Sequence, residues 1–364
     1  MPLLKPDFLG TCEMTYRHLA LLLSLSFFSG CQIGYLFHVS YSHLALLNTK
    51  VPIAEALQSD SLTVEQKRKI LLTQEVRTFA FEKLGLTKSK NYTDFVDLKR
   101  PSVTYAVMAS YKWKFEPYLW KFPIIGKAPY KGFYNEKMAQ EEAAEMKSQD
   151  FDVYVRGVSA FSTLGKLNDP LLSSMLTYPD HDLVNTIIHE LTHTTLFIKD
   201  NIDFNERLAV FVANKGTERF YFAKEGSDST TLQQIQNENA DDTLFSKFIS
   251  TELDQLKQWY IDFDHAQKLS SEEKEDLRQK RFLKIKKSFT EKLAQKLKTK
   301  SYVNFPERLM NNATLGTYQT YMKNLDDFEK VFQKNGATIA QFLKKCEELN
   351  KVDNPEAELK KWAE

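Results

Sequence analysis

Apolar and polar residues along the chain follow two periods, one typical of strands and the other typical of helices. Alternating apolar positions with β-branched and aromatic side chains predict strands over residues 104–110, 113–122 and 151–162. A helix over residues 136–147, with Asn135 as its N-cap, is expected between the last two strands. The sheet is therefore predicted to be small and to come from the first half of the chain.

Helical spacing of apolar residues dominates the rest of the chain, and polar residues mark where several helices begin. The segments Thr63–Gln66 and Ser270–Glu273 match the capping box, in which two backbone donors are satisfied reciprocally. Asn312 is expected to cap a helix that runs to Asn335-Gly336. The pattern predicts a helix-rich α+β fold with a small mixed β-sheet and a helical carboxyl-terminal region over residues 217–364.

One predicted helix, over residues 182–198, carries the residues that suggest chemistry. It contains the segment His189–His193, which reads His-Glu-Leu-Thr-His. Positions four apart on a helix differ by about 400° of rotation, so His189 and His193 project from nearly the same side. Two imidazoles in this arrangement can bind one zinc ion at about 2.0–2.1 Å. The neighbouring Glu190 can accept a proton from the water that attacks a carbonyl carbon.

The alternative interpretation is a pair of helix histidines that face solvent or a polar core. The apolar neighbours Ile187, Ile188 and Leu191 indicate instead that the helix is buried. Imidazoles and a carboxylate without compensating partners are costly in such a place, which favours a metal site. We expect Asp180 or Asp182 to be the N-cap of this helix.

A catalytic zinc ion needs a third protein ligand and an open fourth position. Residues 199–203 predict a turn, after which helical spacing resumes and closes at Gly216, so the two metal helices span residues 182–216. A short turn makes the two helices antiparallel neighbours, and the first turn of the second carries Glu206. Glu206 is therefore the expected third ligand. The acids that compete with it are Asp200, Asp203 and Glu218.

Contacts with a substrate are expected before the metal helix and near the carboxyl end. An extended peptide can pair with an exposed strand edge, and Val158–Thr163 is the candidate edge, although an ordinary core strand fits equally well. The residues expected to contact a peptide are Ala160, Phe161 and Ser162. Stabilising an oxyanion needs a donor besides the metal. Tyr321 or its neighbour Tyr318 could supply that donor, while packing is the commoner role of a helix tyrosine.

Residues 1–30 are expected to be a targeting segment. The apolar run 19–28 follows a basic residue, is too short to span a bilayer comfortably, and ends in Ser29-Gly30-Cys31. This end resembles the lipobox of bacterial lipoproteins, in which the cysteine is acylated. Cys31 would then anchor a domain over residues 31–364 to the bacterial cell envelope, facing the periplasm. An uncleaved anchor helix is the alternative.

Composition and charge exclude several classes of protein. The chain has 364 residues, of which 42% are hydrophobic and 13% aromatic, so it can form a packed core. Its 49 Lys and Arg and 48 Asp and Glu leave a net charge of +1, which argues against a nucleic-acid-binding protein. Its cysteines are too widely spaced for a paired metal motif, so any metal site must use histidines and carboxylates.

The ordered series of motifs resembles a family of predicted bacterial zinc aminopeptidases, many of which are lipoproteins. The similar stretches are Gly34–Leu36, Glu75–Ala80, Trp120–Gly126, Tyr130–Tyr134, Ser162–Gly165, Asp169–Leu171, His189–His193 and Phe204–Glu206. The resemblance implies a zincin-like metallopeptidase fold with His189, His193 and Glu206 as zinc ligands. It also implies that Glu190 is the catalytic base.

The sequence therefore predicts a zinc-dependent peptidase that acts on peptides or unfolded proteins, and the resemblance implies an aminopeptidase. The alternative is an envelope assembly or quality-control factor whose zinc fold mainly binds unfolded chains, which the charged helical carboxyl-terminal region would suit. The resemblance further implies that a disulfide common in the family is absent here, because Lys121 and Lys127 stand where many members have cysteine.

Overall fold

The computed structural model describes residues 30–122, 126–163, 167–266 and 269–364. Its contacts divide the chain into two units, the first ending at Thr49 and the second comprising Lys50–Glu364. The first unit contains helix α2 (Gly30–Leu47). The predicted targeting segment lies almost entirely outside the described residues, so the boundary after residue 30 stays a prediction. Among the described residues, no helix combines the length and the apolar character needed to cross a membrane.

The described residues of the second unit form three small sheets, and one of them is mixed. The strands are β1 (Val51–Pro52), β2 (Asp94–Val96), β3 (Thr104–Tyr111), β4 (Trp120–Phe122), β5 (Gly126–Ala128), β6 (Tyr130–Phe133), β7 (Phe151–Val158) and β8 (Leu171–Leu172). Strand β3 lies between β6 and β7 and is antiparallel to both, while β2 pairs antiparallel with β1 and parallel with β8. Strands β4 and β5 pair antiparallel, with Lys121 and Lys127 as cross-strand partners.

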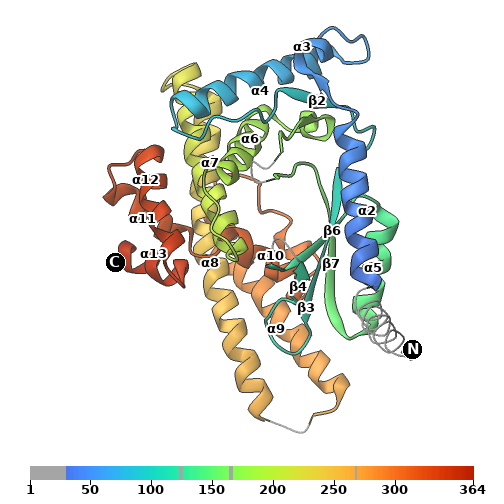
Figure 1. Ribbon diagram of the computed structural model, residues 1–364. Helices are drawn as coiled ribbons and strands as arrows, with labels where there is room; N and C mark the ends of the chain where they lie inside the picture. The colour runs from blue at the N-terminus through green and yellow to red at the C-terminus, as the bar shows by residue number, and fades with distance from the viewer. Residues whose placement is uncertain (1–29, 123–125, 164–166, 267–268) are drawn as a thin grey trace, which may run out of the picture. The chain divides into compact units, whose positions relative to one another are not determined.

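Helices make up most of the unit. They are α3 (Ile53–Ala56), α4 (Val64–Glu82), α5 (Glu136–Ser148), α6 (Asp180–Thr195), α7 (Ile202–Glu225), α8 (Thr230–Ala266), α9 (Ser271–Lys292), α10 (Asn312–Met322), α11 (Leu325–Lys334), α12 (Ile339–Cys346) and α13 (Pro355–Ala363). Short 3-10 helices are η1 (Ser173–Thr177), η2 (Ala294–Lys296), η3 (Phe305–Glu307) and η4 (Glu347–Lys351). The β6-β3-β7 sheet has α5 against one side and α10 against the other (Figure 1). The predicted helix-rich α+β fold is confirmed.

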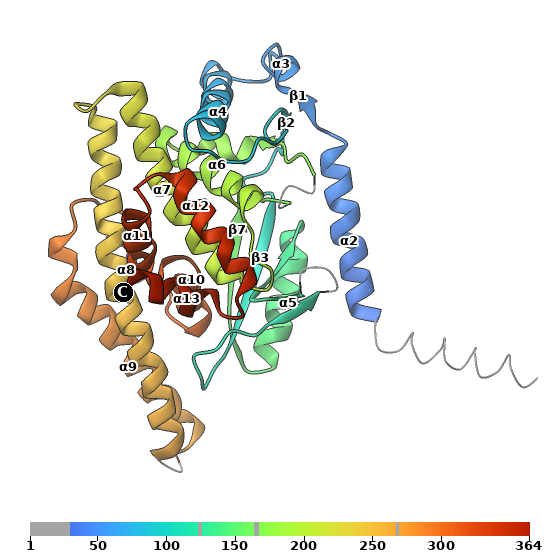
Figure 2. The same ribbon diagram turned by 60° about the vertical axis from the view of Figure 1, so that its left-hand side comes forward.

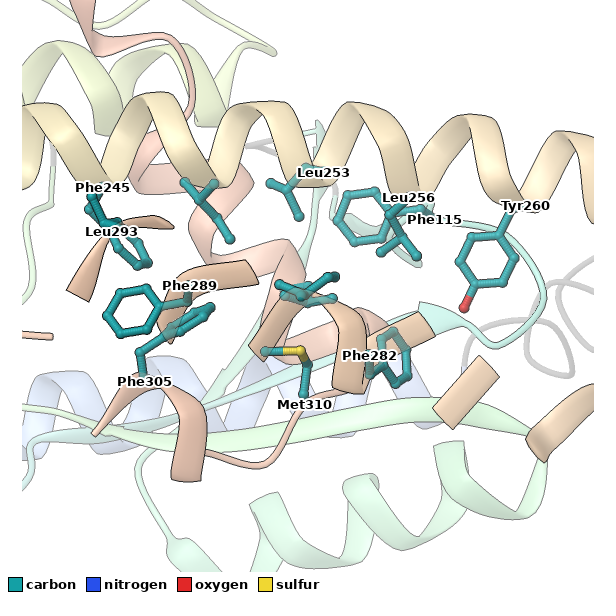
Figure 3. Packing of buried hydrophobic residues seen from close by; sticks show 13 residues of the cluster. Phe115, Phe245, Leu253, Leu256, Tyr260, Phe282, Phe289, Leu293, Phe305 and Met310 are labelled. Atoms are coloured by element: carbon teal, nitrogen blue, oxygen red, sulfur yellow. The ribbon is translucent and has the colours of Figure 1, made fainter. Parts of the chain in front are cut away.

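The carboxyl-terminal helices have an apolar core of their own. Phe245, Leu253 and Tyr260 project from one face of the long helix α8, and Phe289 and Phe305 pack below them (Figure 3). These side chains are almost fully buried, and burying each large apolar side chain contributes about 1.5–3 kcal/mol. Leu315 of α10 belongs to the same buried cluster, so the core holds α10 in place next to α8.

The polar residues expected to start helices do so in three places. Thr63 and Ser270 each complete a capping box, the first with Gln66 and the second with Glu273. Asn135 accepts a hydrogen bond from the backbone N–H of Met138 at the start of α5. These predictions are confirmed, because a cap depends on residues only three positions apart.

The predicted strands over 113–122 and 151–162 are too long. In the first, only Trp120–Phe122 is a strand, since the backbone N–H of Tyr111 bonds to the carbonyl oxygen of Glu116 and folds the intervening residues into a turn. In the second, pairing with β3 ends at Val158.

The prediction for the helix after Asn312 is partly wrong. The N-cap is Asn311, whose side chain accepts from the N–H of Thr314. Asn312 is fully buried, and its side chain donates to the carbonyl oxygen of Tyr111. The chain also breaks at Asn324, where a φ of 55° separates α10 from α11.

Candidate metal centre and active site

Helices α6 and α7 pack side by side and carry the predicted metal ligands (Figures 1 and 2). Helix α6 begins at Asp180, and Pro179 occupies the N-cap position without a side-chain bond to the helix. The predicted capping by Asp180 or Asp182 is therefore wrong. Asp180 lies in the first turn instead, where its carboxylate accepts hydrogen bonds of 2.6 and 2.7 Å from Arg68.

Gly216 does not close the second metal helix, as the sequence suggested, because α7 continues to Glu225. A Cβ atom at Gly216 would lie 2.9 Å from Leu84 Cδ1 and 3.0 Å from Ile188 Cγ2. The missing side chain therefore lets α7 approach α6 closely at this point. Gly226 is the C-cap of α7, and its φ of 84° favours glycine.

A buried asparagine shapes the loop between the two helices. Asn205, which is 1% exposed, accepts a hydrogen bond of 2.8 Å from the N–H of Ile198. It also donates one of 2.7 Å to the carbonyl oxygen of the same residue. This paired contact holds the first turn of α7 against the loop that follows α6, and Glu206 follows Asn205 directly.

The structure brings the three predicted metal ligands together. The Nε2 atoms of His189 and His193 lie 3.2 Å apart. Glu206 Oε2 lies 3.3 Å from His189 Nε2 and 3.7 Å from His193 Nε2. The three ligand atoms lie within 4.8 Å of one another, and all three residues are largely buried, with side chains 6–16% exposed.

These distances fit a single tetrahedral ion. Two ligands bound at about 2.0–2.1 Å to one tetrahedral ion lie about 3.4 Å apart, close to the three separations observed. Burial alone would raise the pKa of Glu206, but the charge of His193 and hydrogen bonds from both imidazoles lower it below its usual range. The carboxylate is therefore ionised and ready to act as a ligand. The group could hold a metal ion.

The competing acids have other roles. Asp203 accepts a hydrogen bond of 2.9 Å from the hydroxyl of Thr320, and Glu218 accepts one of 2.5 Å from Asn239. Asp200 lies in the wall of the cavity described below, but among the described residues it does not belong to the convergent group.

Glu190 lies beside the first ligand and faces the same cavity as the three ligands. Burial raises the pKa of its carboxyl group above the usual value, which suits a group that must accept a proton near neutral pH. Two titratable groups that sequence analysis did not single out as functional interact electrostatically with it. Burial and the charge of Glu190 raise the pKa of the Tyr92 phenol, and burial raises the pKa of Asp169 to about 6.

A cavity of about 490 Å³ opens onto the three ligand residues and Glu190, and we call it the metal-site cavity. The residues predicted to contact a peptide, Ala160, Phe161 and Ser162, all line it. They follow the end of β7, so only Val158 of the predicted strand edge over 158–163 belongs to a strand, and residues 159–163 lie beyond the last β-pair. Asp169 Oδ2 accepts a hydrogen bond of 2.9 Å from the N–H of Thr163, which fixes the end of this segment.

Tyr321 also lines the metal-site cavity, whereas Tyr318 is not among the residues described as lining it. The phenol oxygen of Tyr321 accepts a hydrogen bond of 2.7 Å from Arg156 Nη2, and burial together with the charge of Glu206 raises its pKa well above the usual value. Arg156 was missed by sequence analysis. Its only signal was an arginine on the same strand face as Tyr154, next to the predicted substrate segment.

A comparison with protein families adds an independent finding. The family described as "Putative aminopeptidase" matches residues 34–361, which include every residue of the metal-site cavity. No curated protein and no solved structure matches the chain. Because the match covers most of the sequence and both helices of the candidate site, the chain belongs to the "Putative aminopeptidase" family.

Proposed function

We propose that this protein is a zinc-dependent peptidase, and an aminopeptidase in keeping with its family. The observation that carries the proposal is the convergence of His189 Nε2, His193 Nε2 and Glu206 Oε2 in the wall of a cavity. Two imidazoles and a carboxylate form a donor set typical of catalytic zinc, with a coordination position left open for substrate or water. A zinc ion bound there would polarise a substrate carbonyl and lower the pKa of water toward about 7.

Glu190 is the proposed general base. Its carboxylate lies next to His189 on the same helix and faces the cavity, so it can take the proton of the attacking water. Protonated Glu190 can then deliver that proton to the leaving amine. Burial raises the pKa of this carboxyl group, which strengthens it as a base toward the attacking water.

Tyr321 is the proposed donor to the oxyanion that forms as the carbonyl is attacked. Its oxygen already accepts a hydrogen bond from Arg156, so the phenol hydrogen remains available to a second acceptor. Because burial keeps the phenol protonated at all relevant pH values, the group acts as a hydrogen-bond donor.

The segment over 159–163 is the proposed guide for the peptide. It lies directly after an edge strand and lines the cavity. Backbone groups of such a segment can pair with an extended peptide and align its scissile bond with the ligand group. Ala160, Phe161 and Ser162 are the proposed contacts.

We also propose that Cys31 carries a lipid that anchors the protein to the cell envelope on the periplasmic side. The support is the lipobox-like pattern Ser29-Gly30-Cys31 after a short apolar run. Labelling cells with an alkyne fatty acid should mark the wild-type chain and leave a Cys31→Ser variant unmarked. An unlabelled wild-type chain would contradict the anchor.

The function is best tested by mapping the cuts that the zinc-loaded protein makes in a mixed peptide library by mass spectrometry. The expected result is sequential removal of amino-terminal residues that stops when a chelator is added and resumes with zinc. Internal cuts would support the peptidase proposal and contradict the assignment as an aminopeptidase. Stoichiometric zinc without any cut would favour the alternative of an envelope binding factor.

A further inference from the structure

A second cavity adjoins the metal-site cavity and shares two of its residues. It has a volume of about 550 Å³, and Arg156 and Tyr321 line both cavities. We call it the aromatic cavity because rings of Tyr154, Tyr302 and Tyr318 form much of its wall. The two cavities therefore meet at Arg156 and Tyr321.

The apolar part of the wall is held rigidly by the helical core. Phe305 and Met310, which line the aromatic cavity, belong to the buried cluster below α8 (Figure 3). The Tyr302 ring stacks on Phe245 with 4.0 Å between ring centroids. A preformed cavity with aromatic walls suits a flat or apolar ligand group, because little ordering is needed on binding.

Two arginines give the aromatic cavity a positive charge without a matching negative one. Arg156 donates to Tyr321, and Arg308 Nη1 donates to Tyr318 over 3.2 Å. Among the described residues, no aspartate or glutamate lines the cavity. Arg156 Nε is buried and has no hydrogen-bond partner among these residues.

A buried arginine donor without an acceptor is costly and marks a place where a ligand can bind. Guanidinium groups present paired N–H donors that match a carboxylate, and such charge-assisted bonds are about twice as strong as neutral ones. The metal-site cavity itself contains the acids Glu190 and Glu206, so an anion is better accommodated on the far side of Arg156.

We propose that the aromatic cavity is a subsite for a carboxylate-bearing residue of the peptide substrate, bound through Arg156 with Arg308 as a second positive charge. The inference rests on the proposed peptidase function and names its substrate class. The carboxylate comes either from the carboxyl terminus of a short peptide or from an aspartate or glutamate side chain.

Matched peptides distinguish these two sources. The zinc-loaded full chain is assayed on the tripeptide Leu-Ala-Phe as free acid and as carboxamide, and on the carboxamides of Leu-Ala-Glu and Leu-Ala-Gln. We expect kcat/KM to favour the carboxylate member of one pair by at least about tenfold. A preference for the free acid in the first pair shows that the subsite binds the carboxyl terminus. A preference for the glutamate peptide in the second pair shows that it binds an acidic side chain. Equal rates within both pairs overturn the subsite.

Variants test whether the two arginines cause the preference. Arg156→Met should abolish it, and Arg156→Lys should restore it only in part, because lysine keeps the charge and loses the planar pair of donors. Arg308 is exposed, so Arg308→Met should fold normally and reduce the preference at least about threefold. Lys287→Met is the control. It also removes one positive charge, from a side chain of α9 that is 74% exposed, and should leave the preference intact. An unchanged preference in both arginine variants would contradict the assignment.

A binding measurement keeps the subsite testable if no peptide is cleaved. Calorimetry on a Glu190→Gln variant compares the affinities of the same four peptides without turnover. Tighter binding of a carboxylate member, lost in Arg156→Met, would support the subsite even if the peptidase proposal failed. Equal affinities within both pairs would overturn the subsite while leaving the peptidase proposal to its own test.

Discussion

Glu206 Oε2 lies within 3.7 Å of both imidazole Nε2 atoms, and α7 supplies no other acid to that point among the described residues. Replacing Glu206 by Gln removes the negative charge that holds a divalent ion. Even outer partners of metal ligands are worth about 10–100-fold in affinity, so zinc affinity should fall at least about tenfold. Competition with a chromophoric chelator at pH 7 measures this. Glu218→Gln, on the same helix, should bind zinc as the wild type does; equal affinity of the Glu206 variant would contradict the ligand set.

The phenol hydroxyl of Tyr321 is needed for its proposed role as an oxyanion donor, whereas packing needs only the ring. Tyr321→Phe keeps the ring and removes the hydroxyl that accepts from Arg156. Loss of one oxyanion donor typically lowers kcat about 10²–10³-fold, while zinc content should stay at the wild-type level. Steady-state kinetics on a cleaved peptide checks this, with Tyr118→Phe, which lies outside the cavity lining, as the control. A kcat within about threefold of wild type would assign Tyr321 to packing.

The buried carboxyl group of Asp169 should make stability depend on pH. Burial raises its pKa from 3.8 to about 6, so the folded chain keeps a proton that the unfolded chain releases. Between about pH 4 and 6 this group therefore lowers the free energy of unfolding as pH rises, by up to about 1.4 kcal/mol per pH unit. Asp169→Asn should become more stable relative to wild type across that range.

Urea unfolding at several pH values between 4 and 7 measures the effect. The exposed Asp60→Asn variant is the control, and its difference from wild type should stay constant with pH. A constant difference for Asp169→Asn as well would show that Asp169 is ionised throughout the range.

At the scale of elements, the packing of α6 against α7 depends on a residue that has no side chain. Gly216→Ala places a methyl group within about 3 Å of Leu84 and Ile188, and overpacking of this kind costs about 1–3 kcal/mol. The melting temperature should therefore fall. Gly316→Ala is the matched control, because it adds a methyl group to α10 with nothing within 4 Å and should stabilise the chain by up to about 1 kcal/mol. A stabilised Gly216→Ala variant would mean that the helices can separate freely.

The elements show which structural features a single sequence can predict. Caps at Thr63, Asn135 and Ser270 were predictable because they involve neighbours three positions apart. Gly216 was misjudged because a glycine that ends a helix and a glycine that admits a neighbouring helix look alike in sequence. The strand predicted over 151–162 is too long. The alternating pattern continues past Val158, but pairing with β3 ends at that residue.

At the scale of the whole molecule, the two halves of the candidate site differ in how far the sequence predicts them. The ligand group comes from two helices joined by a short loop, so spacing and rotation along a helix brought His189, His193 and Glu206 together. The pair of Arg156 and Tyr321 is separated by 165 positions and meets only because α10 packs on β7. No local pattern encodes such a contact.

The most direct test of the account measures zinc content and peptide hydrolysis on the same samples of wild type and Glu190→Gln. The wild type should bind one zinc ion per chain and cleave peptides. The variant should keep the zinc and lose at least about 10²-fold in kcat, because it retains the ligands and lacks the base. Near wild-type turnover by the zinc-loaded variant, or a wild-type chain that binds no zinc, would contradict the central claim.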